Sequence, residues 1–184
     1  APAERVLLIQ AGLVQIVRHA ATGDDHSIAL FGPRELVGLT AVLERAPYPA
    51  EAVVVSERAE LWALPAAALE RIAAEDLGFA RALTTALLEH TRALRAKIAM
   101  VTSGDTAQRL AVLFAHLAER FGDEDARGVT FIPLALTRRM LGQLVGARTE
   151  TVIRVLSKWQ QAGLVSTTPA GFEIRALAAL GAAD

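Results

Sequence analysis

Five basic side chains gather near the C-terminal end of this sequence. Between residues 134 and 165, five side chains are basic and one is acidic, although the whole chain has a formal net charge of -1. The basic residues are Arg138, Arg139, Arg148, Arg154 and Lys158, and the acidic one is Glu150. Guanidinium and ammonium groups donate charge-assisted hydrogen bonds to anionic oxygens. This stretch could therefore bind a polyanion by the phosphates of its backbone.

The apolar residues of the same stretch must position these side chains. They recur at spacings of three and four residues, as on one buried face of a helix. They are Met140, Leu141, Leu144, Val145, Val152, Val155, Leu156 and Trp159. Gly146 interrupts the pattern and Gly163 ends it, so we expect two helices joined by a tight turn. Two such helices with a cationic outer face are typical of a DNA-binding helix-turn-helix.

Composition limits the class of protein. The chain has 184 residues, of which 53% are hydrophobic, and this is enough for one or two small domains. It has no cysteine, which excludes disulfides, thiolate metal sites and cysteine-ligated clusters from this stretch. Because neither an uncharged run of about 18 apolar residues nor a signal peptide is visible, we expect a cytoplasmic protein without membrane contact. The first residue is Ala1 and not methionine, so we expect that a preceding segment is missing.

The first part of the chain is rich in short runs of Val, Leu and Ile that are typical of strands. These runs are residues 5–9, 13–19, 27–31, 52–56 and 60–64, with turns expected at 22–25 and 32–33. They predict a small antiparallel β-roll within residues 1–76. Helical patterns follow it, so the predicted fold class is α+β.

Residues 77–103 are predicted to form one long helix and a hinge. A single stripe of mostly apolar residues fits an a/d seam against a partner helix, so we expect homodimerisation through it. The stripe is Phe79, Leu83, Leu87, His90, Leu94, Ile98 and Val101. The alternative is that the stripe packs against the chain's own β-roll. His90 and Lys97 interrupt the seam, which costs less at a dimer interface than deep in a core.

A third region is predicted over residues 104–184. Gly104 can end the long helix, and Asp105 can cap the next one, over residues 106–121. An acidic turn at 121–125 and a strand at 129–132 precede the helix-turn-helix. A hairpin over 165–175 follows it, and a hairpin in this position is a wing.

The order of these parts resembles the Crp/Fnr family of bacterial regulators. Gly32-Pro-Arg-Glu-Leu-Val-Gly38 is similar to the loop before the family's nucleotide-binding segment, and residues 142–156 are similar to its DNA-reading segment. The resemblance implies a sequence-specific transcription regulator that binds an inverted-repeat operator in double-stranded DNA as a homodimer. It implies RNA polymerase as a further partner if the protein activates transcription. The family's sensor domain also begins some strands earlier than Ala1.

The resemblance implies roles for individual residues. Glu150 would accept a hydrogen bond from cytosine N4 and Arg154 would donate to guanine O6 and N7, the alternative being an ordinary surface pair four residues apart. Arg148 stands where relatives often have a small capping hydroxyl, so Thr149 is expected to cap the helix instead. Ile153 either contacts a thymine methyl group or packs inside the protein. The full set expected to contact bases or phosphates is Thr137, Arg138, Arg139, Arg148, Thr149, Glu150, Thr151, Arg154 and Lys158.

The family's cyclic nucleotide site is where this sequence departs from the pattern. Members that bind cyclic AMP have a glutamate where this chain has Leu39, and an arginine and a small hydroxyl residue where it has Pro49 and Ala50. A cyclic phosphate without an arginine loses charge-assisted hydrogen bonds. Arg45 or Arg58 could replace it only if the loop took another path. We therefore expect no control by cyclic AMP and no cofactor, and the effector stays unknown.

Three alternatives stay open at this point. The altered nucleotide site favours a regulator without an effector, controlled by its own abundance. The second alternative is a winged helix that binds another protein, and the basic patch argues against it. The third is a small barrel enzyme, but no catalytic arrangement is visible and the spacing of the four histidines supports no metal site. We expect neither catalysis nor a metal, and His90 stays open as a haem ligand or pH-sensing group at the dimer seam.

Overall fold

Short runs rich in Val, Leu and Ile form the strands of the N-terminal part. In the computed structural model, which describes residues 1–19 and 25–180, Val6, Ile9 and Val14 point inward and are almost completely buried. The described chain divides into two compact units, residues 1–92 and 93–184. The elements of the first unit are β1 (Arg5–Ala11), β2 (Val14–His19), β3 (Asp25–Phe31), β4 (Leu36–Val37), α1 (Leu39–Leu43), β5 (Glu51–Val54), β6 (Glu60–Pro65), α2 (Ala66–Glu75) and the larger part of α3 (Leu77–Thr102).

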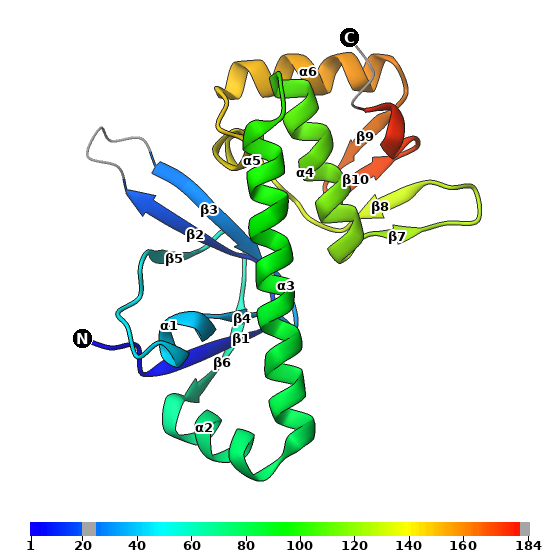
Figure 1. The fold of residues 1–184 in the computed structure, drawn as a ribbon. Coiled ribbons are helices and arrows are strands. Elements are labelled where there is room, and N and C mark those ends of the chain that lie inside the picture. Colours follow the sequence, from blue (N-terminus) through cyan, green and yellow to red (C-terminus); the bar gives the residue numbers. More distant parts are fainter. Residues whose placement is uncertain (20–24, 181–184) are drawn as a thin grey trace. The chain divides into compact units, whose positions relative to one another are not determined.

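The strands of the first unit form two three-stranded antiparallel sheets, with the orders β4-β1-β6 and β3-β2-β5 (Figure 1). The predicted antiparallel β-rich domain and the α+β class are confirmed. The sequence predicted neither β4 nor α1, which have two and five residues and are too short to show a period. Residues 22–24 of the predicted turn lie outside the described residues.

A hydrophobic cluster joins β1, α1, α2 and α3 in the first unit. Its buried members include Val6, Leu39, Val42, Leu69 and Leu83. Side chains of α1, α2 and α3 therefore pack together with Val6 of β1. The first unit thus has a hydrophobic core of its own.

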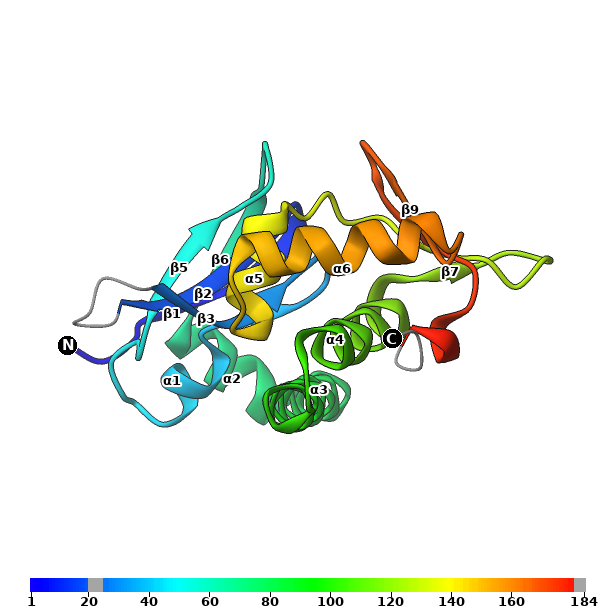
Figure 2. The same ribbon diagram turned by 90° about the horizontal axis from the view of Figure 1, so that it is seen from above.

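After the end of α3, the described part of the second unit contains a sheet, three α-helices and a short 3-10 helix. Its elements are α4 (Thr106–Phe121), β7 (Asp123–Glu124), β8 (Thr130–Ile132), α5 (Arg138–Val145), α6 (Thr149–Gln161), β9 (Val165–Thr168), β10 (Gly171–Ile174) and η1 (Leu177–Ala179). The strands form one antiparallel sheet in the order β7-β8-β10-β9. Helix α4 contacts α5 and α6, and β9 follows α6 (Figure 2). The predicted winged helix-turn-helix is confirmed.

Helix α4 begins where the sequence predicted. The side chain of Asp105 accepts a hydrogen bond from the backbone N–H of Gln108 at 2.9 Å, and the side chain of Gln108 accepts one from the N–H of Asp105 at 3.2 Å. This reciprocal capping box satisfies N–H groups that have no partner inside the helix. The start of α4 is therefore fixed by local sequence.

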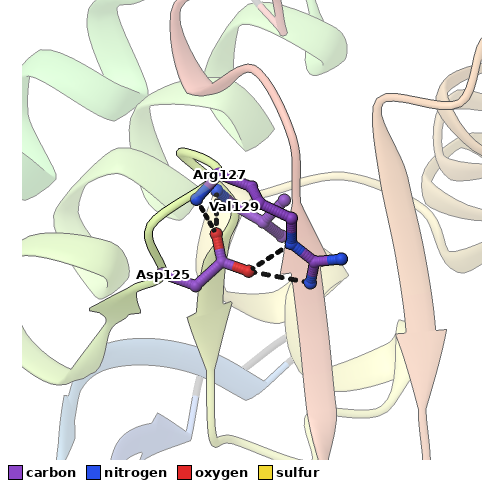
Figure 3. Close-up of polar contacts among 3 residues, drawn as sticks. All are labelled: Asp125, Arg127 and Val129. Carbon is purple, nitrogen blue, oxygen red and sulfur yellow. Dashed lines mark hydrogen bonds and ion pairs between the residues drawn. The ribbon is translucent and has the colours of Figure 1, made fainter.

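The predicted acidic turn at 121–125 contains a short strand, β7, and that part of the prediction was wrong. Asp125 closes the loop after β7, because its carboxylate accepts from the backbone N–H groups of Arg127 at 2.8 Å and Val129 at 3.0 Å (Figure 3). The Arg127 guanidinium donates two further bonds, at 2.9 and 2.8 Å. The loop thus turns the chain back, and β7 pairs with β8.

Phe114 lies at the centre of the second unit. Its ring is completely buried and meets the rings of Trp159 and Phe172 edge to face, with centroids 6.1 and 5.1 Å apart. Trp159 belongs to α6 and Phe172 to β10, so one side chain of α4 supports both the second helix of the helix-turn-helix and the wing. Edge-to-face aromatic pairs add to the energy gained from burial.

In the described part of the chain, no helix has the length and apolar character needed to span a membrane.

Candidate nucleic-acid interface

The turn between α5 and α6 is set by two glycines. Helix α5 ends at Gly146, whose φ of 67° is in the left-handed region that favours glycine. A Cβ on Gly142 would lie 2.7 Å from the carbonyl oxygen of Ala147, so a side chain there would clash with the backbone of the turn. The close approach of α5 to the turn therefore depends on glycine at position 142. At the other end of α5, the Thr137 hydroxyl accepts from the Met140 N–H at 3.2 Å and caps the helix.

Helix α6 has a buried face and an exposed face. Val152, Leu156 and Trp159 are at most 1% exposed. The opposite face carries Glu150, Arg154 and Lys158, all exposed and four residues apart, so they form one line along the helix. Thr149 and Thr151 beside them are half-buried, and Arg148 is exposed. The predicted base-reading and phosphate-binding residues of α6 thus share one accessible surface.

The predicted cap of α6 was wrong. Arg148 occupies the N-cap position with no capping hydrogen bond from its side chain, and Thr149 is already the first residue of the helix. Arginine and a helical threonine cannot fold back onto the first N–H groups as a serine at the N-cap would. The positive end of α6 is therefore left without a side-chain cap, and such an end attracts anions.

Arg138 ties α5 to α6 and to the wing. Its guanidinium donates to the hydroxyl of Thr167 at 2.9 Å, and the side-chain amide of Gln160 donates to the same oxygen at 3.0 Å. The guanidinium also lies 5.7 Å from the ring centroid of Phe172, as in a cation–π contact. Burial lowers the pKa of Arg138 from its usual range. Arg139, its neighbour in α5, is exposed.

Sequence reasoning missed Gln160 and Thr167. Thr167 contacts Arg138 across 29 positions of the chain, and Gln160 donates to the same Thr167 hydroxyl. No local period links Arg138 with a residue at such a distance. The only signal in the sequence was that Thr167 falls within the predicted wing hairpin over residues 165–175.

The wing hairpin also depends on a close approach of two backbone segments, at Gly171 and Ile132. A Cβ on Gly171 would lie 2.0 Å from the carbonyl oxygen of Ile132, and its φ is 155°. The hydroxyl of Thr168 accepts from the N–H of Gly171 at 3.1 Å across the turn. Glycine at 171 therefore lets β10 lie against β8, and the turn carries Pro169 and Ala170 outward, both exposed.

A groove lies between α6 and the beginning of α4. It has a volume of about 460 Å³, and its walls include Arg154, Lys158 and Thr151 from α6 and Asp105 and Thr106 from α4. Arg154 and Lys158 of α6 thus lie next to the N-terminal end of α4, which is the positive end of that helix. Thr106 also lines this groove, although no role was predicted for it.

The stripe of α3 divides into two parts. In the first unit, Leu83 is buried in the cluster of Val6 and Leu39, and Phe79 and Leu87 pack against that cluster. His90 is half-buried and stacks on Phe31, with ring centroids 6.2 Å apart. The last three residues of the stripe carry the exposed apolar surface: Leu94 is 43%, Ile98 62% and Val101 47% exposed.

Three residues at the expected nucleotide site, Leu39, Pro49 and Ala50, lack the side-chain groups that the cyclic-AMP-binding members of the family have there. Leu39 is 5% exposed and belongs to the hydrophobic cluster, and the first turn of α1 has no acidic side chain to bind a ribose hydroxyl. Arg45 pairs with Glu70 at 3.4 Å, so a carboxylate already meets this cation. Pro49 is exposed and Ala50 half-buried, and neither has a side chain that can bind phosphate. Among the residues that the structure describes, no group of three or more His, Cys, Asp or Glu could hold a metal ion.

Comparison with known families gives two matches, one at each end of the chain, with residues 77–107 between them. The model of the Crp-like helix-turn-helix domain matches residues 108–183, and that of the cyclic nucleotide-binding domain matches residues 1–76. The regulatory protein CysR of Synechococcus elongatus is 31% identical over 160 residues, which cover 85% of this chain and 69% of the relative. The CRP-like cAMP-activated global transcriptional regulator of Mycobacterium tuberculosis is 26% identical over 164 residues, covering 89% of this chain and 72% of the relative.

Solved structures show the same fold. That of FixK2 from Bradyrhizobium japonicum superposes with a TM-score of 0.81 at 22% identity, over 100% of this chain and 89% of the other. The transcriptional regulator TTHB099 of the CRP family from Thermus thermophilus superposes with a TM-score of 0.74 at 22% identity, over 98% of this chain and 87% of the other.

Proposed function

The chain belongs to the Crp/Fnr family of transcription regulators, and we propose that it binds an inverted-repeat operator in double-stranded DNA as a homodimer. The family acts through a helix-turn-helix and consists of regulators, not enzymes. One observation carries the proposal for this chain. The line of Glu150, Arg154 and Lys158 is exposed on α6, while the opposite face of that helix is anchored by Val152 and Trp159.

Helix α6 would enter the major groove and read base edges. Glu150 is a hydrogen-bond acceptor and suits the N4 amino group of cytosine, whereas Arg154 donates in a fork that suits guanine O6 and N7. The two residues lie about 6 Å apart along the helix axis, so they reach adjacent or next-adjacent base pairs. This pair would set the sequence preference of each half-site.

The remaining polar residues would contact the phosphates and fix the register. Arg139, Arg148 and Lys158 are exposed cations around α5 and α6. Thr149 and Thr151 lie at the uncapped start of α6, where backbone N–H groups also suit an anion. Thr137 and Arg138, at the start of α5, would contribute from the side that adjoins the wing. Their bonds to Met140 and Thr167 would hold them in place.

The second protomer would pack along α3. Leu94, Ile98 and Val101 are exposed at spacings of four and three, as in an a/d seam. Their burial in a dimer would remove apolar surface from water. The half-buried Phe79, Leu87 and His90 would extend this seam, whereas Leu83, which the sequence also assigned to it, is buried in the core of its own unit. A two-fold axis in the protein would then match the two halves of an inverted repeat.

We further propose that cyclic AMP does not control this protein. One relative is named as cAMP-activated, but here the buried Leu39 and the Arg45–Glu70 pair do not suit a cyclic nucleotide. The same observations favour a variant of the proposal in which no effector binds and the protein's abundance sets its activity. RNA polymerase would be a partner if the protein activates transcription.

Selection of bound duplexes from a randomised DNA pool tests the main proposal. We expect enrichment of an inverted repeat with half-site centres about one helical turn apart. A sequence pool that stays random through repeated rounds at moderate salt would contradict sequence-specific binding. Enrichment of a single, asymmetric half-site would contradict the homodimer and leave base reading by α6 standing.

A further inference from the structure

Ile153 is an apolar side chain in the middle of the polar face of α6. It is 47% exposed, while Val152, Leu156 and Trp159 of the same helix are at most 1% exposed. The packing of α6 therefore does not use it. Ile153 is three positions after Glu150 and four after Thr149, so it shares their surface.

Helix formation does not explain an isoleucine at this position. A β-branched side chain has restricted χ1 rotamers in a helix, and isoleucine forms helices less readily than alanine or leucine. Single exposed apolar residues are common on protein surfaces. This one is flanked by the two residues proposed to read bases, which is where an apolar contact would carry sequence information.

Only one base presents an apolar group in the major groove, and that is thymine with its C5 methyl. The side chain of Ile153 has no donor or acceptor, so it would leave the N4 amino group of cytosine or the O6 of guanine without a hydrogen bond. A thymine methyl loses nothing by the same contact and is removed from water by it. The chemistry of this side chain thus selects one base.

We propose that Ile153 is a specificity-determining residue that packs on a thymine methyl group in each half-site. This rests on the proposed function, because it requires α6 to lie in the major groove. Three residues rise about 4.5 Å along a helix, and successive base pairs are about 3.4 Å apart along each strand. The thymine would therefore belong to a base pair next to the one that Glu150 contacts.

The test removes the methyl group from the DNA and the isoleucine from the protein, separately and together. Each thymine of the selected half-site is replaced in turn by deoxyuridine, which keeps base pairing and lacks only that methyl. For the unaltered protein we expect binding to weaken about fourfold at one position of each half-site, the effect of about one buried methyl group. Ile153→Ala should bind the unmodified operator more weakly and should lose this difference between thymine and uracil.

Lys158→Ala is the matched control on the same helix. It should bind every duplex more weakly and keep the full loss on replacing thymine, because a phosphate contact does not sense the base. Circular dichroism of Ile153→Ala checks that α6 stays folded, as expected for a change to a better helix former.

The possible failures can be told apart. If the unaltered protein selects an operator but tolerates uracil at every position, the methyl contact is wrong and the proposed function stands. The same follows if Ile153→Ala keeps the full difference between thymine and uracil. If the protein selects no operator at all, both the proposed function and the contact are wrong.

Discussion

The ammonium group of Lys97 donates a hydrogen bond to the backbone carbonyl oxygen of Leu144. Lys97 lies in the last third of α3, and Leu144 lies in the last turn of α5. Carbonyl groups at the end of a helix have no partner inside it, and the helix dipole makes this end negative. Lys97 thus binds the C-terminal end of the first helix of the helix-turn-helix, next to the turn that leads into α6.

The buried position of Lys97 predicts how the free energy of unfolding changes at alkaline pH. Burial lowers the pKa of Lys97 from its usual value of 10.5. Between the lowered value and 10.5 the unfolded chain holds more protons than the folded one, so the free energy of unfolding should rise with pH in this window. Lys97→Met keeps most of the aliphatic side chain and should lose that rise.

Urea unfolding at several pH values between 8 and about 10.5 measures this effect. Lys158→Met is the matched control, because Lys158 is the other lysine of the chain and is exposed. It should keep the same slope as the unaltered protein. Parallel curves for Lys97→Met and the unaltered protein would mean that Lys97 has a similar pKa in the folded and unfolded chain.

A second pH effect is expected at the acid end, from the loop after β7. The backbone N–H of Val129 and the guanidinium and N–H of Arg127 hold the pKa of Asp125 below its usual value of 3.8. A carboxyl group with a lowered pKa stabilises the fold above its unfolded value and loses this contribution as the pH falls through its folded value. Asp125→Asn should therefore flatten the loss of stability below about pH 4.

Chemical unfolding between pH 2 and 6 checks this prediction. Asp123→Asn, two residues earlier on β7, removes the same charge from an exposed position and serves as control. If both variants change the acid limb of the curve equally, the effect comes from net charge and not from the hydrogen bonds of Asp125.

The contacts of Phe114 predict a joint effect on α6 and the wing. Phe114→Ala should destabilise the second unit by about 3–5 kcal/mol, because it leaves a cavity between Trp159 and Phe172. The fluorescence of Trp159 and DNA binding should change together. Phe121→Ala removes a half-buried ring at the end of the same helix and should have a smaller effect. Equal losses in the two variants would contradict a central role for Phe114.

The helices that carry the candidate site could be predicted because their signals are local. Asp105 and Thr137 cap α4 and α5, Gly146 ends α5, and the apolar spacing in between shows the buried face. The expected cap by Thr149 failed because a hydroxyl at the start of a helix predicts a cap only if it falls on the N-cap itself. In this chain the N-cap is one residue earlier, at Arg148.

Other features depend on contacts between distant parts of the chain. The bond from Arg138 to Thr167 and the bond from Lys97 to Leu144 join residues 29 and 47 positions apart. The sequence pattern of α3 is one continuous stripe, yet Leu83 is buried in its own unit and Ile98 is exposed. A periodic pattern shows which face of a helix is apolar, but the surrounding fold decides what covers each part of that face.

Titration with cyclic AMP tests the departure at the nucleotide site. We expect no saturable heat of binding in calorimetry, because the buried Leu39 cannot accept a hydrogen bond from a ribose hydroxyl and Arg45 is paired with Glu70. The cAMP-activated relative from Mycobacterium tuberculosis is the positive control for the assay. Saturable binding to this chain at micromolar concentrations would show that other residues hold the phosphate.

The last prediction separates base reading from phosphate binding on α6. Arg154→Ala should reduce the preference for the selected operator by about 1–3 kcal/mol per half-site, because a guanine loses its bidentate donor. Lys158→Ala should instead weaken binding to all duplexes alike and reduce the slope of log K against log salt by about 1 per contact. Binding of both variants to specific and random duplexes is measured at several salt concentrations. Light scattering should show the same oligomeric state for both variants and the unaltered protein, since neither residue lies on α3. If Arg154→Ala keeps its operator preference and Lys158→Ala loses it, the two roles must be exchanged. The line of exposed residues would then read bases one turn further along the helix than proposed.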